Sequence, residues 1–113
     1  MSGAVLEDRI AEAFRKRGYI VFTRSNHCDV LAVKPDMSLA YLVECKDYVL
    51  SPKQQVLAVR ELNRNYTHAL ELLIQKRLCP EKVLKVLVAN GFSYQARGVL
   101  QYTPKTFIQH VSS

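Results

Sequence analysis

Cysteine, glycine and proline are all scarce in this sequence, and tryptophan is absent. Its 113 residues include three cysteines, four glycines and four prolines. This composition, with 49% hydrophobic residues, argues against a collagen-like, linker-like or disordered chain. Cys28, Cys45 and Cys79 are odd in number and show no CxxC spacing, so the sequence indicates neither a disulfide framework nor a four-ligand zinc site. We therefore expect a folded protein in a reducing compartment, the cytoplasm.

Long apolar runs are missing as well. None approaches the roughly 18 uninterrupted residues that a membrane-spanning helix needs. Glu7, Asp8 and Arg9 interrupt the N-terminal segment before a signal-like apolar block could form. We expect no membrane association and no export. The length suits one domain over residues 1–113, large enough to bury a core without a disulfide.

Negative charge is in deficit. Ten Asp and Glu stand against sixteen Lys and Arg, which gives a formal charge of +6 and a pI near 9.4. This balance favours a polyanionic partner, nucleic acid above all, because Lys and Arg that neutralise phosphates release condensed counterions. The basic residues are dispersed without a long run, so a basic surface without such a partner is an equally good interpretation. Charge alone therefore does not assign a function.

The first half of the sequence predicts one helix and three strands. Apolar residues at helical spacing from Leu6 to Phe14 indicate an amphipathic helix, which Ser2 can cap and Gly18 would end. Runs of apolar and β-branched residues predict strands at 19–23, 29–33 and 39–46. A short turn joins the last two strands, so we expect them to pair as an antiparallel hairpin.

The second half predicts a long helix, a strand and a tail of short elements. These elements are a helix from Ser51-Pro52 to Leu78, ended by Pro80, a strand at 83–89, a short helix from Ser93 through Ala96 and an edge-type strand at 106–108. Residues 63–65 are either a break in the long helix or part of it. The order is helix, three strands, helix, strand, helix, optional strand. We therefore expect an α/β fold with a mixed central sheet of four to five strands flanked by helices.

Two charged side chains project from the same face of the third expected strand. Glu44 and Lys46 are two residues apart and share a face, while Cys45 points into the core on the other side. Residues 40–43 are apolar enough for a central strand, where charges are unfavourable unless they are paired or bound to metal. Asp29 begins the neighbouring strand of the hairpin, so it can lie beside Glu44. An exposed ion pair at a strand end is the alternative interpretation of Glu44 and Lys46.

Two carboxylates with an adjacent lysine are what the hydrolysis of a phosphodiester needs. Asp29 and Glu44 can hold Mg²⁺ or Mn²⁺ through oxygen ligands and leave metal positions open to water and phosphate. Lys46 can orient or deprotonate the attacking water, or neutralise charge on the phosphate. The sequence therefore predicts a catalytic metal site at Asp29, Glu44 and Lys46.

These residues resemble the motif of the PD-(D/E)xK nuclease superfamily, which has the restriction-endonuclease-like fold. The motif here is Asp29, fourteen intervening residues and Glu44-Cys45-Lys46. Further similarity to archaeal Holliday junction resolvases and Mrr-type endonucleases is found in Leu6-Glu7-Asp8-Arg9, in Gly18-Tyr19, and in Ser25 before Asp29-Val30-Leu31-Ala32. The resemblance covers residues 5–60, and residues 83–92 fit the strand that follows in that fold.

The resemblance implies a Mg²⁺- or Mn²⁺-dependent DNA endonuclease similar to a Holliday junction resolvase. Its substrate can be branched DNA. It implies that Asp29 and Glu44 bind the metal, that Glu7 on the first helix reaches the same metal, and that Lys46 completes catalysis. Glu12 is the alternative to Glu7 for this role. The resemblance also places a polar accessory residue, Gln54 or Gln55, near the site. Small members of the family usually pair, so a homodimer is implied, and the apolar stretch 70–74 offers a surface for it.

Polar and basic residues around the expected site are further candidates. Ser25 and His27 precede Asp29 in an expected active-site loop, where His27 is more readily a loop or phosphate contact than a general base. Basic candidates for contact with a nucleic-acid backbone are Arg24 and Lys34 near the site and Lys53 and Arg60 on the long helix, although a solvated face explains them equally well. Two other classes stay open: a non-catalytic nucleic-acid-binding module with a nuclease fold, and a purely structural interaction domain.

Overall fold

The computed structural model describes residues 4–25 and 28–113, with the side chains of residues 24, 25 and 28 outside the description. The described elements, in chain order, are α1 (Ala4–Lys16), β1 (Ile20–Ser25), β2 (Cys28–Val33), β3 (Ala40–Val49), α2 (Pro52–Gln75), β4 (Val83–Gly91), β5 (Leu100–Tyr102) and α3 (Pro104–Ser112). The strands form one sheet in the order β1-β2-β3-β4-β5. The expected α/β class with a mixed sheet is confirmed, and the sheet has five strands.

The sheet joins an antiparallel half to a parallel half. β2 and β3 form the expected antiparallel hairpin, with residue 30 opposite residue 43, and β1 adds antiparallel to β2. β3 and β4 are parallel, because α2 returns the chain across the sheet between them. β5 adds parallel to β4 at the edge. β3 therefore lies at the centre of the sheet.

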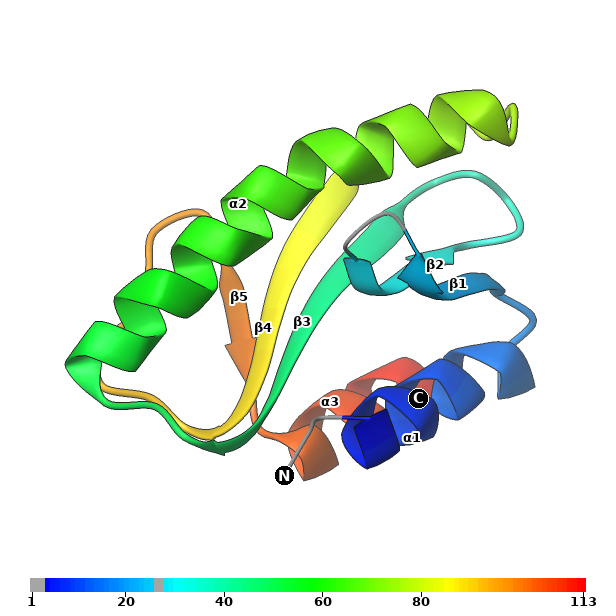
Figure 1. Ribbon diagram of the computed structural model, residues 1–113. Helices are drawn as coiled ribbons and strands as arrows, with labels where there is room; N and C mark the ends of the chain where they lie inside the picture. The colour runs from blue at the N-terminus through cyan, green and yellow to red at the C-terminus, as the bar shows by residue number, and fades with distance from the viewer. Residues whose placement is uncertain (1–3, 26–27) are drawn as a thin grey trace.

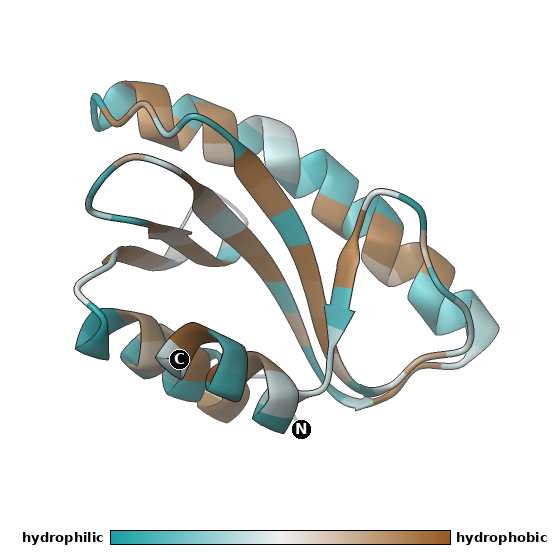
Figure 2. Cartoon of the chain, turned by 180° about the vertical axis from the view of Figure 1, so that it is seen from behind, coloured by the Kyte–Doolittle hydropathy of each residue, from teal (hydrophilic) through white to brown (hydrophobic). Residues whose placement is uncertain are grey.

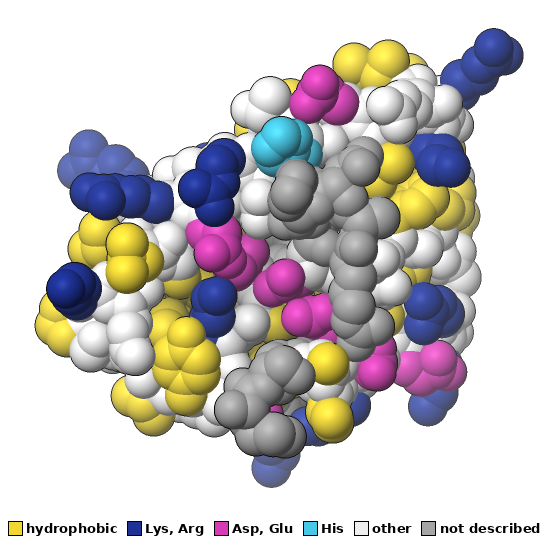
Figure 3. All heavy atoms as spheres, viewed as in Figure 1, with side chains coloured by type: hydrophobic (Ala, Val, Ile, Leu, Met, Phe, Trp, Pro, Cys, Tyr) yellow, Lys and Arg dark blue, Asp and Glu magenta, His cyan; other side chains and the backbone are white. Residues whose placement is uncertain are grey.

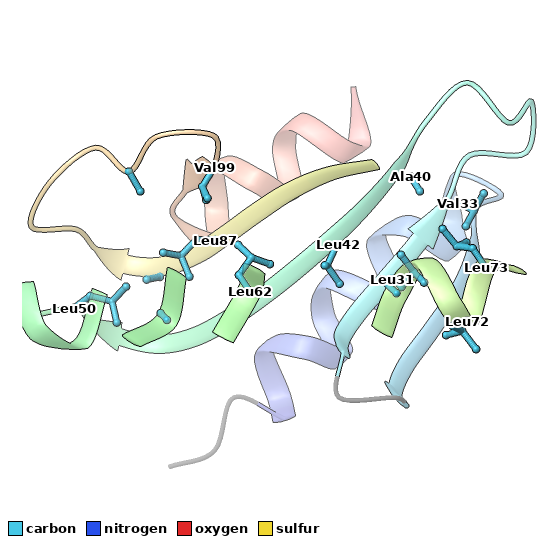
Figure 4. Close-up of a cluster of buried hydrophobic side chains, with 14 residues drawn as sticks. Leu31, Val33, Ala40, Leu42, Leu50, Leu62, Leu72, Leu73, Leu87 and Val99 are labelled. Atoms are coloured by element: carbon cyan, nitrogen blue, oxygen red, sulfur yellow. The ribbon is translucent and has the colours of Figure 1, made fainter. Parts of the chain in front are cut away.

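Helices cover both faces of the sheet (Figure 1). α2 lies over one face, where Leu42, Leu62 and Leu87 pack together in one buried cluster (Figure 4). α1 and α3 cover the other face and share a second cluster with Val43 and Phe107. Figure 2 shows that the central strands are hydrophobic over much of their length, while the helices carry hydrophobic and hydrophilic residues in alternation. Successive residues of β3 therefore face different helical layers.

Helix α2 runs unbroken through residues 63–65 and has 24 residues. Its N-cap is Ser51, as expected, and the structure adds a capping box: Gln54 N donates to Ser51 Oγ at 3.2 Å, and Ser51 N donates to Gln54 Oε1 at 2.9 Å. It ends at Gln75, three residues before the expected Leu78. Arg77 adopts a left-handed conformation at φ 57°, and Leu78 N turns back to the Leu73 carbonyl at 2.9 Å. In the described part of the chain, no helix is both long and apolar enough to cross a membrane.

The expected order of elements in the tail is wrong. Ser93 caps no helix; its Oγ donates to the Leu50 carbonyl at 2.7 Å, and the chain loops on to β5. Residues 106–108, expected as an edge strand, belong to α3. Pro104 stands in the first turn of this helix, and Phe107 and Val111 are four residues apart on its buried side. The helical period therefore outweighs the β-branched character of this short segment.

Candidate active site

The catalytic candidates lie where β2 and β3 pass beneath α2. Glu44 and Lys46 are on the same face of β3 as Leu42, which packs in the core below this helix. The hairpin register pairs residues 30 and 43, so its next step sets Asp29 opposite Glu44. The structure thus brings Asp29, Glu44 and Lys46 to one place. Their catalytic role stays a prediction.

A fourth charged residue, Glu61 of α2, joins this group. Lys46 Nζ lies 3.3 Å from Glu44 Oε2 and 3.3 Å from Glu61 Oε1. Asp29 Oδ2 accepts a hydrogen bond from the Cys45 backbone N–H at 2.9 Å. We call Asp29, Glu44, Glu61 and Lys46 the carboxylate cluster. Figure 3 shows acidic side chains in a band across one face of the molecule, with lysines and arginines nearby.

Glu44 is the most deeply buried member of the carboxylate cluster, with 2% of its surface exposed. Burial raises its pKa to about 9, and a hydrogen bond with Glu61 and the charge of Asp29 act in the same direction. The same hydrogen bond lowers the pKa of Glu61, while burial raises the pKa of Asp29. At neutral pH, Glu44 therefore holds a proton that it donates to Glu61. Burial opposes the charge of Lys46, but attraction from Glu44 and Glu61 outweighs it and raises the lysine pKa.

The substitution Glu44→Gln is expected to flatten the pH dependence of stability. Between the ordinary pKa of 4.5 and about 9, the folded wild type binds more protons than the unfolded chain, so its free energy of unfolding falls as pH rises. Asp29 acts in the same direction, whereas Glu61 acts only at lower pH. Urea unfolding at roughly pH 5.5 and 8.5 measures the loss. An equal loss in wild type, Glu44→Gln and the exposed control Glu81→Gln would contradict the burial of a protonated carboxyl.

Sequence reasoning missed two residues that α2 supplies to this region. Glu61 contacts Lys46, and Asn65, one helical turn later, donates from Nδ2 to Glu44 Oε1 at 3.4 Å. Asn65 is buried and follows Ala58 and Leu62 along the side of α2 that faces the sheet. The signal was present in the sequence, because a polar residue at a core position of an amphipathic helix needs a polar partner.

Glu7 lies on α1, the helix that covers the opposite face of the sheet. It is close enough to Cys45 to contribute, after burial and Asp29, to a raised pKa of that thiol. Cys45 itself is buried in the core beneath α1 and α3, as expected. It stays a prediction that Glu7 reaches a metal held by Asp29 and Glu44.

Three candidates before Asp29 are described only in part or not at all. The strand register places residue 24 of β1 opposite Asp29, so the backbone of Arg24 lies next to the site. Its side chain, and that of Ser25, are outside the description. His27 lies in the gap between the two described ranges. The roles expected for Arg24, Ser25 and His27 stay predictions.

Gln54 and Gln55 are expected as accessory residues near the site. In the structure both make hydrogen bonds to other parts of the fold. Gln54 belongs to the capping box of α2. Gln55 is fully buried and anchors the loop before β5: its Oε1 accepts from Ser93 N at 2.7 Å, and its Nε2 donates to the Tyr94 carbonyl at 2.7 Å. Both amide atoms of Gln55 are thus engaged by the loop.

Replacement of Gln55 by alanine is expected to lower the free energy of unfolding by about 2–3 kcal/mol, because it removes a fully buried side chain together with its hydrogen bonds to the Ser93 N–H and the Tyr94 carbonyl. The neighbouring Gln54→Ala removes only half of an exposed capping box and should cost about 1 kcal/mol or less. Urea denaturation of the two variants measures the difference. A similar loss in both would show that the loop does not depend on Gln55.

The basic candidates divide into two groups. Lys53 and Arg60 are exposed on α2, the helix that carries Glu61. Lys34 does not flank the carboxylate cluster as expected, because it follows the opposite end of β2. Five residue-to-residue steps of extended chain, roughly 17 Å, separate it from Asp29. Binding of nucleic acid by any of these residues stays a prediction.

The chain was also compared with known proteins. No protein-family model, curated protein or solved structure matches it. The resemblance to nucleases therefore stays a prediction from the motif residues. Over residues 4–25 and 28–113, no three or more His, Cys, Asp or Glu side chains stand together as a ready-made metal site. Within the carboxylate cluster, the ammonium of Lys46 lies between Glu44 and Glu61.

Proposed function

We propose that this protein is a metal-dependent DNA endonuclease of the restriction-endonuclease-like fold, with the carboxylate cluster as its active site. The observation that carries the proposal is the convergence of Asp29, Glu44 and Lys46, from adjacent strands, on one face of the sheet. A surface ion pair would not need a carboxyl that is almost completely buried. A buried group of like charges is instead typical of a functional site.

The side chains of the carboxylate cluster fit a hard divalent cation. Carboxylate oxygens are the ligands that Mg²⁺ and Mn²⁺ prefer, and Asp29 and Glu44 would hold the ion, with Glu61 as an additional ligand or as a partner of Glu44. These carboxyls are crowded and share a proton in the absence of a cation. A cation between them would stabilise the group. When bound, the cation would supply Lewis acidity and a water of lowered pKa.

The chain's own residues would then have distinct tasks. Lys46 carries a charge beside the carboxylates and would orient the attacking water and neutralise the scissile phosphate. Asp29 is oriented by the Cys45 N–H, and Glu44 by Asn65. Arg64 is close enough to Glu61 to lower its pKa further and, with Lys53 and Arg60, would contact the DNA backbone from α2.

The proposal also includes a substrate and an oligomeric state. We propose that the DNA is branched, as for Holliday junction resolvases, and that two copies pair through the exposed side of α2 near its end. Leu70 and Ile74 are exposed there, and Ile74 has 75% of its surface accessible. A reducing, cytoplasmic location is supported by Cys45 and Cys79, which are both free.

Metal-dependent cleavage tests the proposal. The protein is incubated with supercoiled, linear and four-way-junction DNA in Mg²⁺ or Mn²⁺, and in parallel with a chelator. Cleavage of at least one substrate only when the cation is present supports the nuclease. If wild type and Asp29→Ala bind DNA equally well and leave every substrate intact, the protein is instead a non-catalytic binding module.

Glu61→Gln is expected to weaken Mn²⁺ binding by about 10- to 100-fold, because it removes a charge that lies beside the expected ligands. Isothermal titration calorimetry with MnCl₂ measures the affinity without any substrate. Glu71→Gln is the matched control, since Glu71 is an exposed carboxyl ten residues further along the same helix. Equal Mn²⁺ affinity in wild type and both variants would remove Glu61 from the site.

A further inference from the structure

A polar cavity lies on the other face of the sheet, away from the carboxylate cluster. It has a volume of about 380 Å³ and is bounded by the end of α1, the turn after β2, the start of β3 and the end of α3. The side chains that matter are Arg17, Tyr19, Lys34, Tyr41 and His110. Tyr41 has the opposite orientation to Glu44 and Lys46, because it is an odd number of residues away along β3. This cavity is therefore separate from the proposed active site.

The cavity is rich in hydrogen-bond donors and positive charge. Arg17 and Lys34 are cationic, and none of the described residues that line the cavity is an Asp or a Glu. Asp36, whose charge acts on Tyr19, accepts a hydrogen bond from Ser38 N at 2.9 Å. Arg17 Nη2 already donates at 3.4 Å to an oxygen of Ser113, the last residue of the sequence, and its guanidinium has four further N–H groups. The lining thus suits an anion with several acceptor oxygens.

The aromatic groups of the cavity are held in place by their neighbours. Tyr41 is only 7% exposed, and its hydroxyl lies 3.3 Å from His110 Nε2. The His110 ring stacks on Tyr102, with 5.4 Å between ring centroids. Fixed donors lose little conformational entropy when they bind a ligand. The Tyr41–His110 pair would therefore form a rigid wall opposite the flexible ends of Arg17 and Lys34.

We propose that this cavity binds a phosphate group, either a free phosphate or the terminal phosphate of a nucleic-acid end. Arg17 and Lys34 supply the charge, and the Tyr19 hydroxyl and His110 complete the set of donors. A phosphate fits better than a carboxylate, because donors approach from the helix end, from the turn and from α3, and phosphate offers acceptor oxygens in all these directions. The site does not depend on the proposed nuclease activity.

The test is a titration of ¹⁵N-labelled protein with inorganic phosphate at constant ionic strength, followed by amide chemical shifts. A short oligonucleotide with a 5′-phosphate, and the same one with a 5′-hydroxyl, form the second arm. We expect saturable shifts around Tyr19, Lys34 and His110, and an affinity lower on the order of tenfold in Arg17→Gln and in Lys34→Gln. Arg97→Gln, an exposed change in the loop before β5, should leave the affinity unchanged.

The two arms separate the sources of the phosphate. Binding of inorganic phosphate indicates a free ligand, and binding of only the 5′-phosphorylated oligonucleotide indicates a nucleic-acid end. The proposal is overturned if neither gives saturable shifts at the cavity, if the 5′-hydroxyl oligonucleotide binds as well as the phosphorylated one, or if Arg17→Gln and Lys34→Gln bind like Arg97→Gln. Both residues lie at the surface, and circular dichroism confirms that each variant is folded.

Discussion

Replacement of Lys46 by alanine is expected to lower the rate of metal-dependent DNA cleavage by a factor of about 100 to 10,000. The loss arises because the ammonium, 3.3 Å from a Glu44 carboxyl oxygen, would be the only cation that the protein itself places among the described members of the carboxylate cluster. Cleavage of the best substrate under single-turnover conditions measures the effect. Mn²⁺ affinity should fall much less, or rise, since a positive charge is removed from beside the ligands.

The matched control is Lys82→Ala, an exposed lysine just before β4. It lowers the net charge of the protein by the same amount, so it accounts for any general loss of affinity for DNA. If Lys46→Ala and Lys82→Ala cleave DNA at the same rate, Lys46 is not catalytic, and its pair with Glu44 is structural.

The largest effect on stability is expected for Phe14→Ala, with a loss of about 3–5 kcal/mol in the free energy of unfolding. Phe14 is fully buried, and its ring centroid lies 5.0 Å from that of Tyr19, 5.5 Å from that of Tyr41 and 5.8 Å from that of Phe107. Its removal leaves a cavity between α1, the sheet and α3. Urea denaturation measures the loss.

Val5→Ala is the control for Phe14→Ala, because Val5 is on the same helix with 62% of its surface exposed. It should change stability by no more than about 0.5 kcal/mol. A small loss for Phe14→Ala as well would show that α1 and α3 do not depend on each other for packing.

Local sequence patterns predicted the part of the fold that contains the motif. Gly18, now with φ 80°, ends α1, and the short turn between two apolar runs produces the β2–β3 hairpin. Strand alternation then sufficed to place Glu44 and Lys46 on one face. These predictions succeeded because each depends on residues close together in the chain.

Features that depend on distant contacts were missed or predicted wrongly. The loop before β5 is held by Gln55, almost forty residues earlier, so Ser93 was mistaken for a helix cap. Glu61 joins the carboxylate cluster only because α2 docks across the hairpin. Lys34 is expected near the site, but the extended strand β2 carries it to the other end of the sheet. The catalytic roles themselves remain predictions.

At the proposed metal site, the crossover through α2 would make cation binding depend on the native topology. The hairpin alone contributes two acidic groups, and the third arrives from a helix that belongs to the parallel half of the sheet. Any partly folded state with that helix displaced would coordinate an ion no better than an isolated pair of carboxylates. An enzyme assembled in this way would not cut DNA before its chain had finished folding.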